Sequence, residues 1–191
     1  MNQNICVFCS SSDKVDGLYF QSAVELGKRI GREGDHLVYG GTTVGLMGTV
    51  ARAAAQNGSR IIGIIPRRIH EAGIGWPEAE EYIITEEMRE RKTLLSEKAD
   101  AFIALPGGFG TMEEILEVMT AKQLGYHKKA IIFLNTNGFY MPLLHHFENV
   151  YEQHFAKESY RSLYFVAQDT EEVYAYFNNY KAMKSESKWY E

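Results

Sequence analysis

The chain has 191 residues, 45% of them hydrophobic, and a formal net charge of −5. It is long and apolar enough for one sizeable core and a single domain, and its acidity, without a long Lys/Arg cluster, argues against a nucleic-acid partner bound through its phosphates. No apolar run approaches the roughly 20 residues of a membrane span and the N-terminus does not resemble a signal peptide, so we expect no membrane partner.

The two cysteines, Cys6 and Cys9, lie close together in one extended run. Side chains on the same strand are poorly placed to form a disulfide, and no Cys or His spacing typical of a metal site occurs. We therefore expect reduced thiols, no metal site and a cytoplasmic protein.

In chain order, short apolar runs typical of strands alternate with segments in which apolar residues recur at helical spacing. The expected strands are residues 4–10, 36–39, 60–65, 81–85, 101–105, 130–134 and 163–166. The expected helices are residues 18–32, a segment from the glycine-rich turn 40–48 to about 56, residues 86–98, a segment that begins near 111, and residues 139–153 and 170–180. Strands that are nearly all apolar indicate a mainly parallel sheet covered on both faces. The predicted fold is a Rossmann-like, doubly wound α/β domain over residues 1–180, followed by a polar tail at 181–191.

Three turns follow strands of this predicted sheet: one at Ser10, one at Gly40 and Gly41, and one at residues 106–108. Ligands of such sheets bind beyond the carboxyl ends of the strands, so we expect the three turns to face one crevice. Residues 66–76, between the third and fourth strands, are equally compatible with a mobile flap near the ligand and with an inert connection.

The turn at residues 106–111 has the sequence Pro-Gly-Gly-Phe-Gly-Thr and opens a helix. Glycines let the backbone approach a ligand, and the N-terminal end of the helix dipole favours an anion, which together predict a phosphate site. Glu113 and Glu114 follow in the same first turn. An acid beside a phosphate cradle indicates a phosphate ester held next to a reacting centre.

Other nucleotide-binding and catalytic motifs do not fit. The glycines near residues 40 and 108 lack the G-x-G-x-x-G spacing of dinucleotide-binding folds, and Glu113 stands where the third glycine belongs. Neither a Walker Lys-Ser/Thr ending nor a G-x-S-x-G nucleophile elbow occurs. The histidines at 145, 146 and 154 form no metal-ligand pattern with nearby acids and are expected on helix surfaces.

Read together, three segments resemble the LOG family, the cytokinin-activating phosphoribohydrolases often mislabelled lysine decarboxylases. The family pattern P-G-G-x-G-T-x-x-E is matched in full at residues 106–114. The element M-H-x-R-K corresponds to residues 88–92 with Arg89 in place of His, and G-G-G-x-x-G-L-M-G to residues 40–48 with Thr42 in place of the third Gly. The likeness extends from the first strand to residues 139–140.

The resemblance implies hydrolysis of the N-glycosidic bond of a nucleoside 5′-monophosphate, to free base and ribose 5-phosphate, by Arg91 and Glu114 and without a cofactor. It also implies a homodimer with active sites near the interface. A carboxylate near C1′, here Glu114, stabilises the charge that develops on the ribose or deprotonates the attacking water. Arg91 suits either the phosphate or the edge of the base. The other expected substrate contacts are Ser10, Gly41, Glu71, Met88, Lys92, Gly107, Gly108, Gly110, Thr111 and Glu113.

Both catalytic candidates also have a purely structural interpretation. Thr111 and Glu114 have the spacing of a helix capping box, and Arg91 follows Glu87 at the spacing of a surface ion pair. The alternative function is a nucleotide- or cofactor-binding carrier of the same fold without turnover, although the presence of both Arg91 and Glu114 favours the enzyme. Lysine decarboxylation with pyridoxal phosphate is disfavoured, because the chain is short and no lysine has the context of a Schiff-base site.

Overall fold

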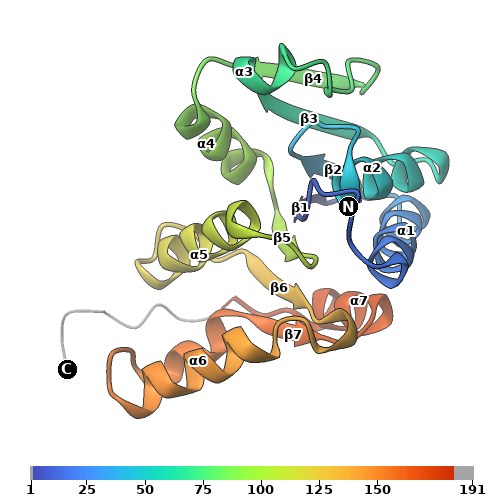
Figure 1. Cartoon of the computed structure of the whole chain (residues 1–191). Helices are drawn as coiled ribbons and strands as arrows, with labels where there is room; N and C mark the ends of the chain where they lie inside the picture. Colours follow the sequence, from blue (N-terminus) through green and yellow to red (C-terminus); the bar gives the residue numbers. More distant parts are fainter. Residues whose placement is uncertain (1, 183–191) are drawn as a thin grey trace.

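The computed structural model describes residues 2–182, so the expected tail at 181–191 lies almost entirely outside the described residues. In the described part, seven parallel strands form one sheet in the order β4-β3-β2-β1-β5-β6-β7 (Figure 1). The strands are β1 (Asn4–Phe8), β2 (His36–Tyr39), β3 (Ile61–Pro66), β4 (Glu81–Thr85), β5 (Ala101–Ala104), β6 (Ala130–Leu134) and β7 (Phe165–Ala167).

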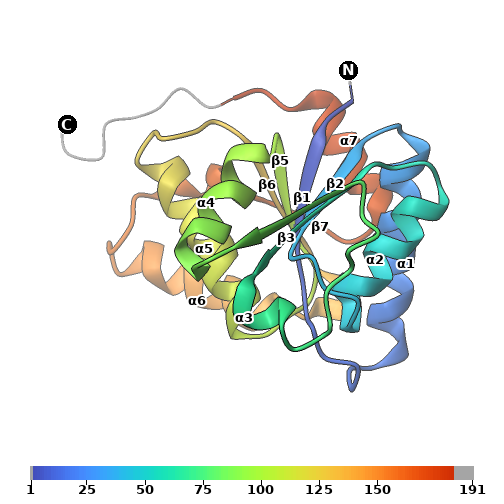
Figure 2. The same ribbon diagram turned by 90° about the horizontal axis from the view of Figure 1, so that it is seen from above.

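Helices cover both faces of this sheet (Figure 2). One face packs against α1, α2 and α7, and the other packs against α4, α5 and α6. The helices are α1 (Gly17–Arg32), α2 (Gly45–Gln56), α3 (Arg67–His70), α4 (Met88–Lys98), α5 (Phe109–Gln123), α6 (Met141–Glu152) and α7 (Thr170–Asn179), with 3₁₀ turns at Thr136–Gly138 and Glu158–Leu163. The parallel sheet between two helical layers confirms the predicted Rossmann-like fold.

The first strand shows why the strands are apolar throughout. Ile5 and Val7 belong to the core under α1 and α2, whereas Cys6 and Phe8 belong to the core under α4 and α5. Both faces of the strand are therefore buried from Ile5 to Phe8, and these four successive positions are all apolar. Cys9 belongs to the first of these cores, so the two free cysteines lie on opposite faces of the sheet.

The order of the strands places the ligand crevice. The chain runs outward from β1 through β2, β3 and β4, returns to β5 on the other side of β1, and then continues outward to β7. The connections diverge between β1 and β5, which makes this the switch point at which doubly wound sheets bind ligands. The loops after β1, β2 and β5 meet there, as the positions of the three turns predicted.

Most element boundaries agree with the sequence interpretation. The strands predicted at 36–39, 81–85 and 130–134 match β2, β4 and β6 residue for residue, and the other four strands differ by one or two residues at an end. The third strand extends one residue beyond the predicted 60–65, because Pro66 is its last residue and pairs with Thr85 on the neighbouring strand. Within residues 2–182, no helix is long and apolar enough to cross a membrane.

The segment 66–76 is folded against the second glycine turn. It begins with α3, which the sequence did not predict, and then runs antiparallel to residues 41–43. The Thr43 amide donates to the Ile74 carbonyl oxygen at 2.8 Å, and the Trp76 amide donates to the Gly41 carbonyl oxygen at 3.0 Å. Ile69 of α3 lines the cavity described below, which places the segment beside the crevice.

Candidate active site

A cavity of about 380 Å³ opens at the carboxyl ends of β1, β2 and β5. It is lined by Cys9, Ser10, Ser11, Ser12, Gly40, Thr42, Met47, Ile69, Arg91, Gly108, Phe109, Gly110, Thr111 and Glu114. A second cavity, of about 470 Å³, lies between α4 and α5 and shares Glu114 with the first. We place the candidate site in the first cavity because the loops of the switch point converge there.

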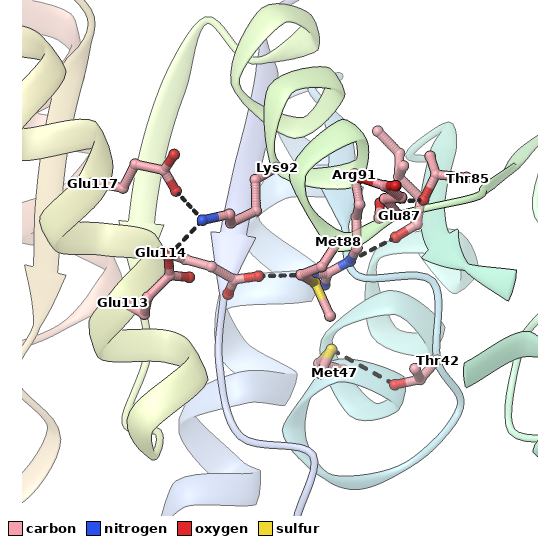
Figure 3. A network of polar contacts seen from close by, with 11 residues as sticks. Thr42, Met47, Thr85, Glu87, Met88, Arg91, Lys92, Glu113, Glu114 and Glu117 are labelled. Atoms are coloured by element: carbon pink, nitrogen blue, oxygen red, sulfur yellow. Dashed lines mark hydrogen bonds and ion pairs between the residues drawn. The ribbon is translucent and has the colours of Figure 1, made fainter. Parts of the chain in front are cut away.

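Arg91 and Glu114 form a buried ion pair inside this cavity (Figure 3). Arg91 Nη1 donates to Glu114 Oε1 at 2.6 Å, and the two side chains are only 9% and 13% exposed. Arg91 Nε donates to the Ile64 carbonyl oxygen at 3.0 Å, so the guanidinium is held between the end of β3 and the first turns of α5. Its third nitrogen, Nη2, lies next to Gly40 and has no hydrogen-bond acceptor within residues 2–182.

These contacts rule out the two structural interpretations that the sequence left open, a capping box for Glu114 and a surface ion pair for Arg91. The N-cap of α5 is Gly108, and no side chain caps the helix, so the capping box suggested by Thr111 and Glu114 does not form. Arg91 pairs with Glu114 rather than with Glu87 one turn earlier on α4. Two charged groups that the sequence also allowed on helix surfaces are therefore brought together in the crevice.

Burial shifts the pKa of Glu114. Desolvation raises the pKa of Glu114 above its usual value, and the charge of Arg91 and its hydrogen bond offset part of that rise. A carboxylate with a raised pKa accepts a proton more readily than an exposed one. Such a shift is typical of groups that exchange protons during a reaction.

The N-terminus of α5 offers free donors to an anion. The amides of Phe109, Gly110 and Thr111 find no acceptor within residues 2–182, as expected for the first turn of an uncapped helix. All three residues line the cavity. Their N–H groups and the helix dipole form the anion cradle, by which we mean residues 108–111.

The N-terminus of α2 is not available in the same way. The Gly45 amide donates to Asp13 Oδ1 at 2.8 Å, and the amides of Leu46 and Met47 donate to the Ser10 carbonyl oxygen at 2.9 and 3.3 Å. The loop after β1 thus supplies the acceptors that a bound anion would otherwise provide. Of the two glycine-rich turns, only the one before α5 presents an open cradle.

Gly40 makes room for the Arg91–Glu114 pair. A Cβ atom at this position would overlap Arg91 Nη2 and would lie 2.8 Å from Met47 Sδ. We expect Gly40→Ala to displace the Arg91 guanidinium and to lower kcat/KM at least tenfold, since misplacement by about 1 Å costs up to 10²-fold in rate. Gly17→Ala is the matched control, because nothing lies within 4 Å of a Cβ there. Equal activity of the two variants in a base-release assay would show that the space at Gly40 is not needed.

The structure brings only part of the remaining predicted residues to the cavity. Ser10, Gly108, Gly110 and Thr111 line it. Met88 lies beside Arg91, with its Sδ 3.6 Å from Nη1. Met88 itself does not line the cavity. Three further predicted contacts do not line it either: Gly41, which packs against Ile65, Gly107, which packs against Thr111, and Glu71, which is exposed at the end of α3.

Lys92 and Glu113 also lie away from the cavity (Figure 3). Lys92 Nζ pairs with Glu113 at 2.5 Å and with Glu117 at 2.8 Å, and this cluster joins α4 to α5. Lys92 lines the second cavity, on the other side of Glu114. Its position favours a role in holding the two helices together, and both carboxylates raise its pKa.

Two positions at which the chain departs from the family pattern differ in their surroundings. Arg89 is exposed on α4 and does not line the cavity. Thr42 is buried in the cavity wall, and its hydroxyl donates to Met47 Sδ at 3.6 Å.

The sequence interpretation did not assign Ile69, Phe109 or Cys9 to the site, although all three line the cavity. Cys9 lies inside the predicted strand 4–10, and its place beside the turn at Ser10 was the available signal, whereas Ile69 depends on the unexpected helix α3.

Comparisons with known proteins show the family to which this chain is related. Residues 47–177 match the model of a family described as possible lysine decarboxylase. A probable cytokinin riboside 5′-monophosphate phosphoribohydrolase of Oryza sativa subsp. japonica is 38% identical over 191 residues, which cover 98% of this chain and 78% of the rice protein. A cytokinin riboside 5′-monophosphate phosphoribohydrolase of Rhodococcoides fascians is 41% identical over 174 residues, 88% of this chain and 86% of the bacterial one.

Solved structures share the fold at lower identity. A molybdenum cofactor binding protein from Rippkaea orientalis superposes with a TM-score of 0.72 at 21% identity, over 94% of this chain and 97% of the other. A Moco carrier protein from Chlamydomonas reinhardtii gives a TM-score of 0.71 at 22% identity, over the same shares. At this identity the likeness shows a common fold and does not transfer a ligand.

Proposed function

This chain belongs to the family whose model is described as possible lysine decarboxylase and whose matching curated members are cytokinin riboside 5′-monophosphate phosphoribohydrolases, and we propose that it catalyses the same reaction. The enzyme hydrolyses the N-glycosidic bond of a nucleoside 5′-monophosphate and releases the free base and ribose 5-phosphate. The observation that carries the proposal is the buried Arg91–Glu114 pair, which lies next to the open anion cradle at the start of the helix that bears Glu114.

The geometry suits a substrate held by its phosphate. Glu114 follows Thr111 by three residues, which is about 4.5 Å along the helix axis. A 5′-phosphate on the cradle therefore brings the ribose to the level of Glu114. Clamping the phosphate keeps C1′ in register with the carboxylate, which removes much of the entropic cost of reaction.

Breaking the bond between C1′ and the base builds positive charge on the ribose. Glu114 stabilises that charge as a carboxylate or takes the proton of the attacking water. Arg91 favours the ionised form of Glu114 against the effect of burial, and its free Nη2 presents a cationic donor to the crevice. In these roles Glu114 is the general base, and the pair together provides the electrostatic environment of the reaction.

A base-release assay tests the proposal. We expect AMP or an N6-prenylated AMP to yield free base and ribose 5-phosphate in equal amounts, measured by chromatography. The alternative, a carrier of the same fold, would bind the nucleotide tightly and release no base. Proteins of this fold include a Moco carrier protein, so the fold alone does not decide between the two functions.

The raised pKa of Glu114 predicts the pH dependence of the reaction. Below that pKa the carboxyl is protonated and cannot act as a base, so activity falls as the pH is lowered. Since burial shifts the pKa upward, we expect the acid limb of kcat/KM to lie above about 4.3, the ordinary value for glutamate. A profile of kcat/KM against pH measures the position of this acid limb, and circular dichroism at each pH shows whether the protein remains folded. A rate that stays constant down to pH 4 would contradict this role.

We also propose that the enzyme is a homodimer. The resemblance implies one, and the outer face of α5 supports it, because Leu116 and Leu124 are 36% and 41% exposed and Tyr126 nearby is 82% exposed. These residues line one open groove along the helix that carries Glu114. Light scattering should give twice the chain mass of 21.7 kDa. A mass of 21.7 kDa at micromolar concentration would contradict the dimer.

A further inference from the structure

Two residues distant in the sequence, Ser10 and Tyr140, form hydrogen bonds to the turn that precedes the anion cradle. Leu105, Pro106 and Gly107 connect β5 to α5. The Pro106 carbonyl oxygen accepts from the Ser10 amide at 3.3 Å, and Gly107 packs against the side chain of Thr111. The carbonyl oxygen of Leu105 accepts from the hydroxyl of Tyr140 at 2.7 Å.

The Leu105–Pro106 peptide depends on this contact more than an ordinary peptide does. Proline has no N–H group, so the carbonyl of Leu105 is the only backbone polar group of that peptide plane. Leu105 is fully buried, which leaves its carbonyl without an easy substitute partner. The hydroxyl of Tyr140 thereby fixes the orientation of the plane immediately before the two glycines.

Tyr140 itself is held rigidly. Its side chain is 0% exposed, and its ring packs edge-on against Phe133 and Phe139 at centroid distances of 4.9 and 5.1 Å. Its backbone amide donates to Asn135 Oδ1 at 2.8 Å. The hydroxyl therefore has one well-defined position, set by Phe133 of β6 and by residues that follow this strand.

Tyr140 does not line the cavity and cannot touch the ligand directly. We propose that Tyr140 is a positioning residue for the phosphate: its hydroxyl fixes the Leu105–Pro106 peptide and so aims the amides of the anion cradle. The proposal rests on the proposed function, in which that cradle holds the 5′-phosphate. It extends the site to a residue 35 positions beyond the turn that it orients.

Tyr140→Phe tests the proposal because it removes one hydroxyl and keeps the ring. The matched control is Tyr160→Phe, since Tyr160 is also buried but its hydroxyl has no hydrogen-bond partner in the described part of the chain. Titration calorimetry with inorganic phosphate measures the cradle without turnover. The steady-state KM and kcat for AMP measure the same effect in the reaction.

We expect Tyr140→Phe to weaken phosphate binding and to raise KM for AMP by about five- to tenfold, the effect of one hydrogen bond, with a smaller change in kcat. Tyr160→Phe should change neither constant. A purely structural role would lower the melting temperature of Tyr140→Phe but leave the phosphate Kd within twofold, and that result would overturn the proposal. Equal losses in both variants, or a wild-type chain that does not bind phosphate, would overturn it as well. If the wild type binds phosphate but releases no base from AMP, the proposed reaction fails while the phosphate titration still decides the role of Tyr140.

Discussion

Replacing Glu114 by glutamine should lower kcat by a factor of about 10²–10⁴ while the protein remains folded and still binds nucleotide. The amide keeps the size of the side chain and can still accept from Arg91 Nη1, but it neither carries negative charge nor takes a proton from water. This loss corresponds to about 3 to 5 kcal/mol of activation free energy, which is more than a helix cap contributes to stability. Single-turnover base release from AMP measures the effect.

Glu113→Gln is the matched control for this experiment. Glu113 precedes Glu114 on the same helix turn, but its side chain is 55% exposed and pairs with Lys92 outside the crevice. We expect this control to keep kcat within a few-fold of the wild-type value. Similar rates for the two variants would remove Glu114 from the reaction.

Replacing Arg91 by methionine should abolish most turnover and also destabilise the fold. The change leaves Glu114 and the Ile64 carbonyl oxygen without their donor in a buried setting. Breaking a buried pair on one side typically costs about 3–5 kcal/mol, although protonation of Glu114 relieves part of it. Because Arg91 lowers the pKa of Glu114, its removal raises that pKa further and favours the protonated form.

Urea unfolding and base release together measure both effects of Arg91→Met. Arg89→Met is the control for stability, since Arg89 lies two residues earlier on α4 and is exposed, and such changes usually stay within about 0.5 kcal/mol. If Arg91→Met unfolds at the same urea concentration as the control, the pair contributes nothing to the fold. Unchanged turnover would contradict its role in the reaction.

The sequence predicted the fold and the centre of the site because both depend on local patterns. Runs of consecutive apolar residues predict parallel strands that are buried on both faces. The glycine-rich turn at residues 106–111 predicts a helix N-terminus with an acid beside it. Spacing along one helix also placed Glu114 in the first turns of α5. Arg91 entered the predicted site only through the resemblance to a family. Its ion pair with Glu114 was not predicted, since 23 residues separate the two in the sequence.

The remaining features depend on contacts between distant segments, which local patterns do not encode. The two glycine turns look alike in sequence. In the structure the Ser10 carbonyl and the Asp13 carboxylate accept hydrogen bonds from the first amides of α2, whereas the first amides of α5 have no acceptor in the described part of the chain. Lys92 follows Arg91 directly, yet its side chain reaches Glu113 and Glu117 on the neighbouring helix instead of the crevice. Both outcomes follow from packing between elements rather than from residue type.

The central claim is that the anion cradle holds a 5′-phosphate so that Glu114 faces the anomeric carbon. A crystal structure of the Glu114→Gln variant with bound AMP tests it most directly, because the slow variant preserves the substrate. We predict phosphate oxygens on the amides of Phe109, Gly110 and Thr111 and the carboxamide directed at C1′. A phosphate bound elsewhere, or a carboxamide turned away from the ribose, would contradict the account.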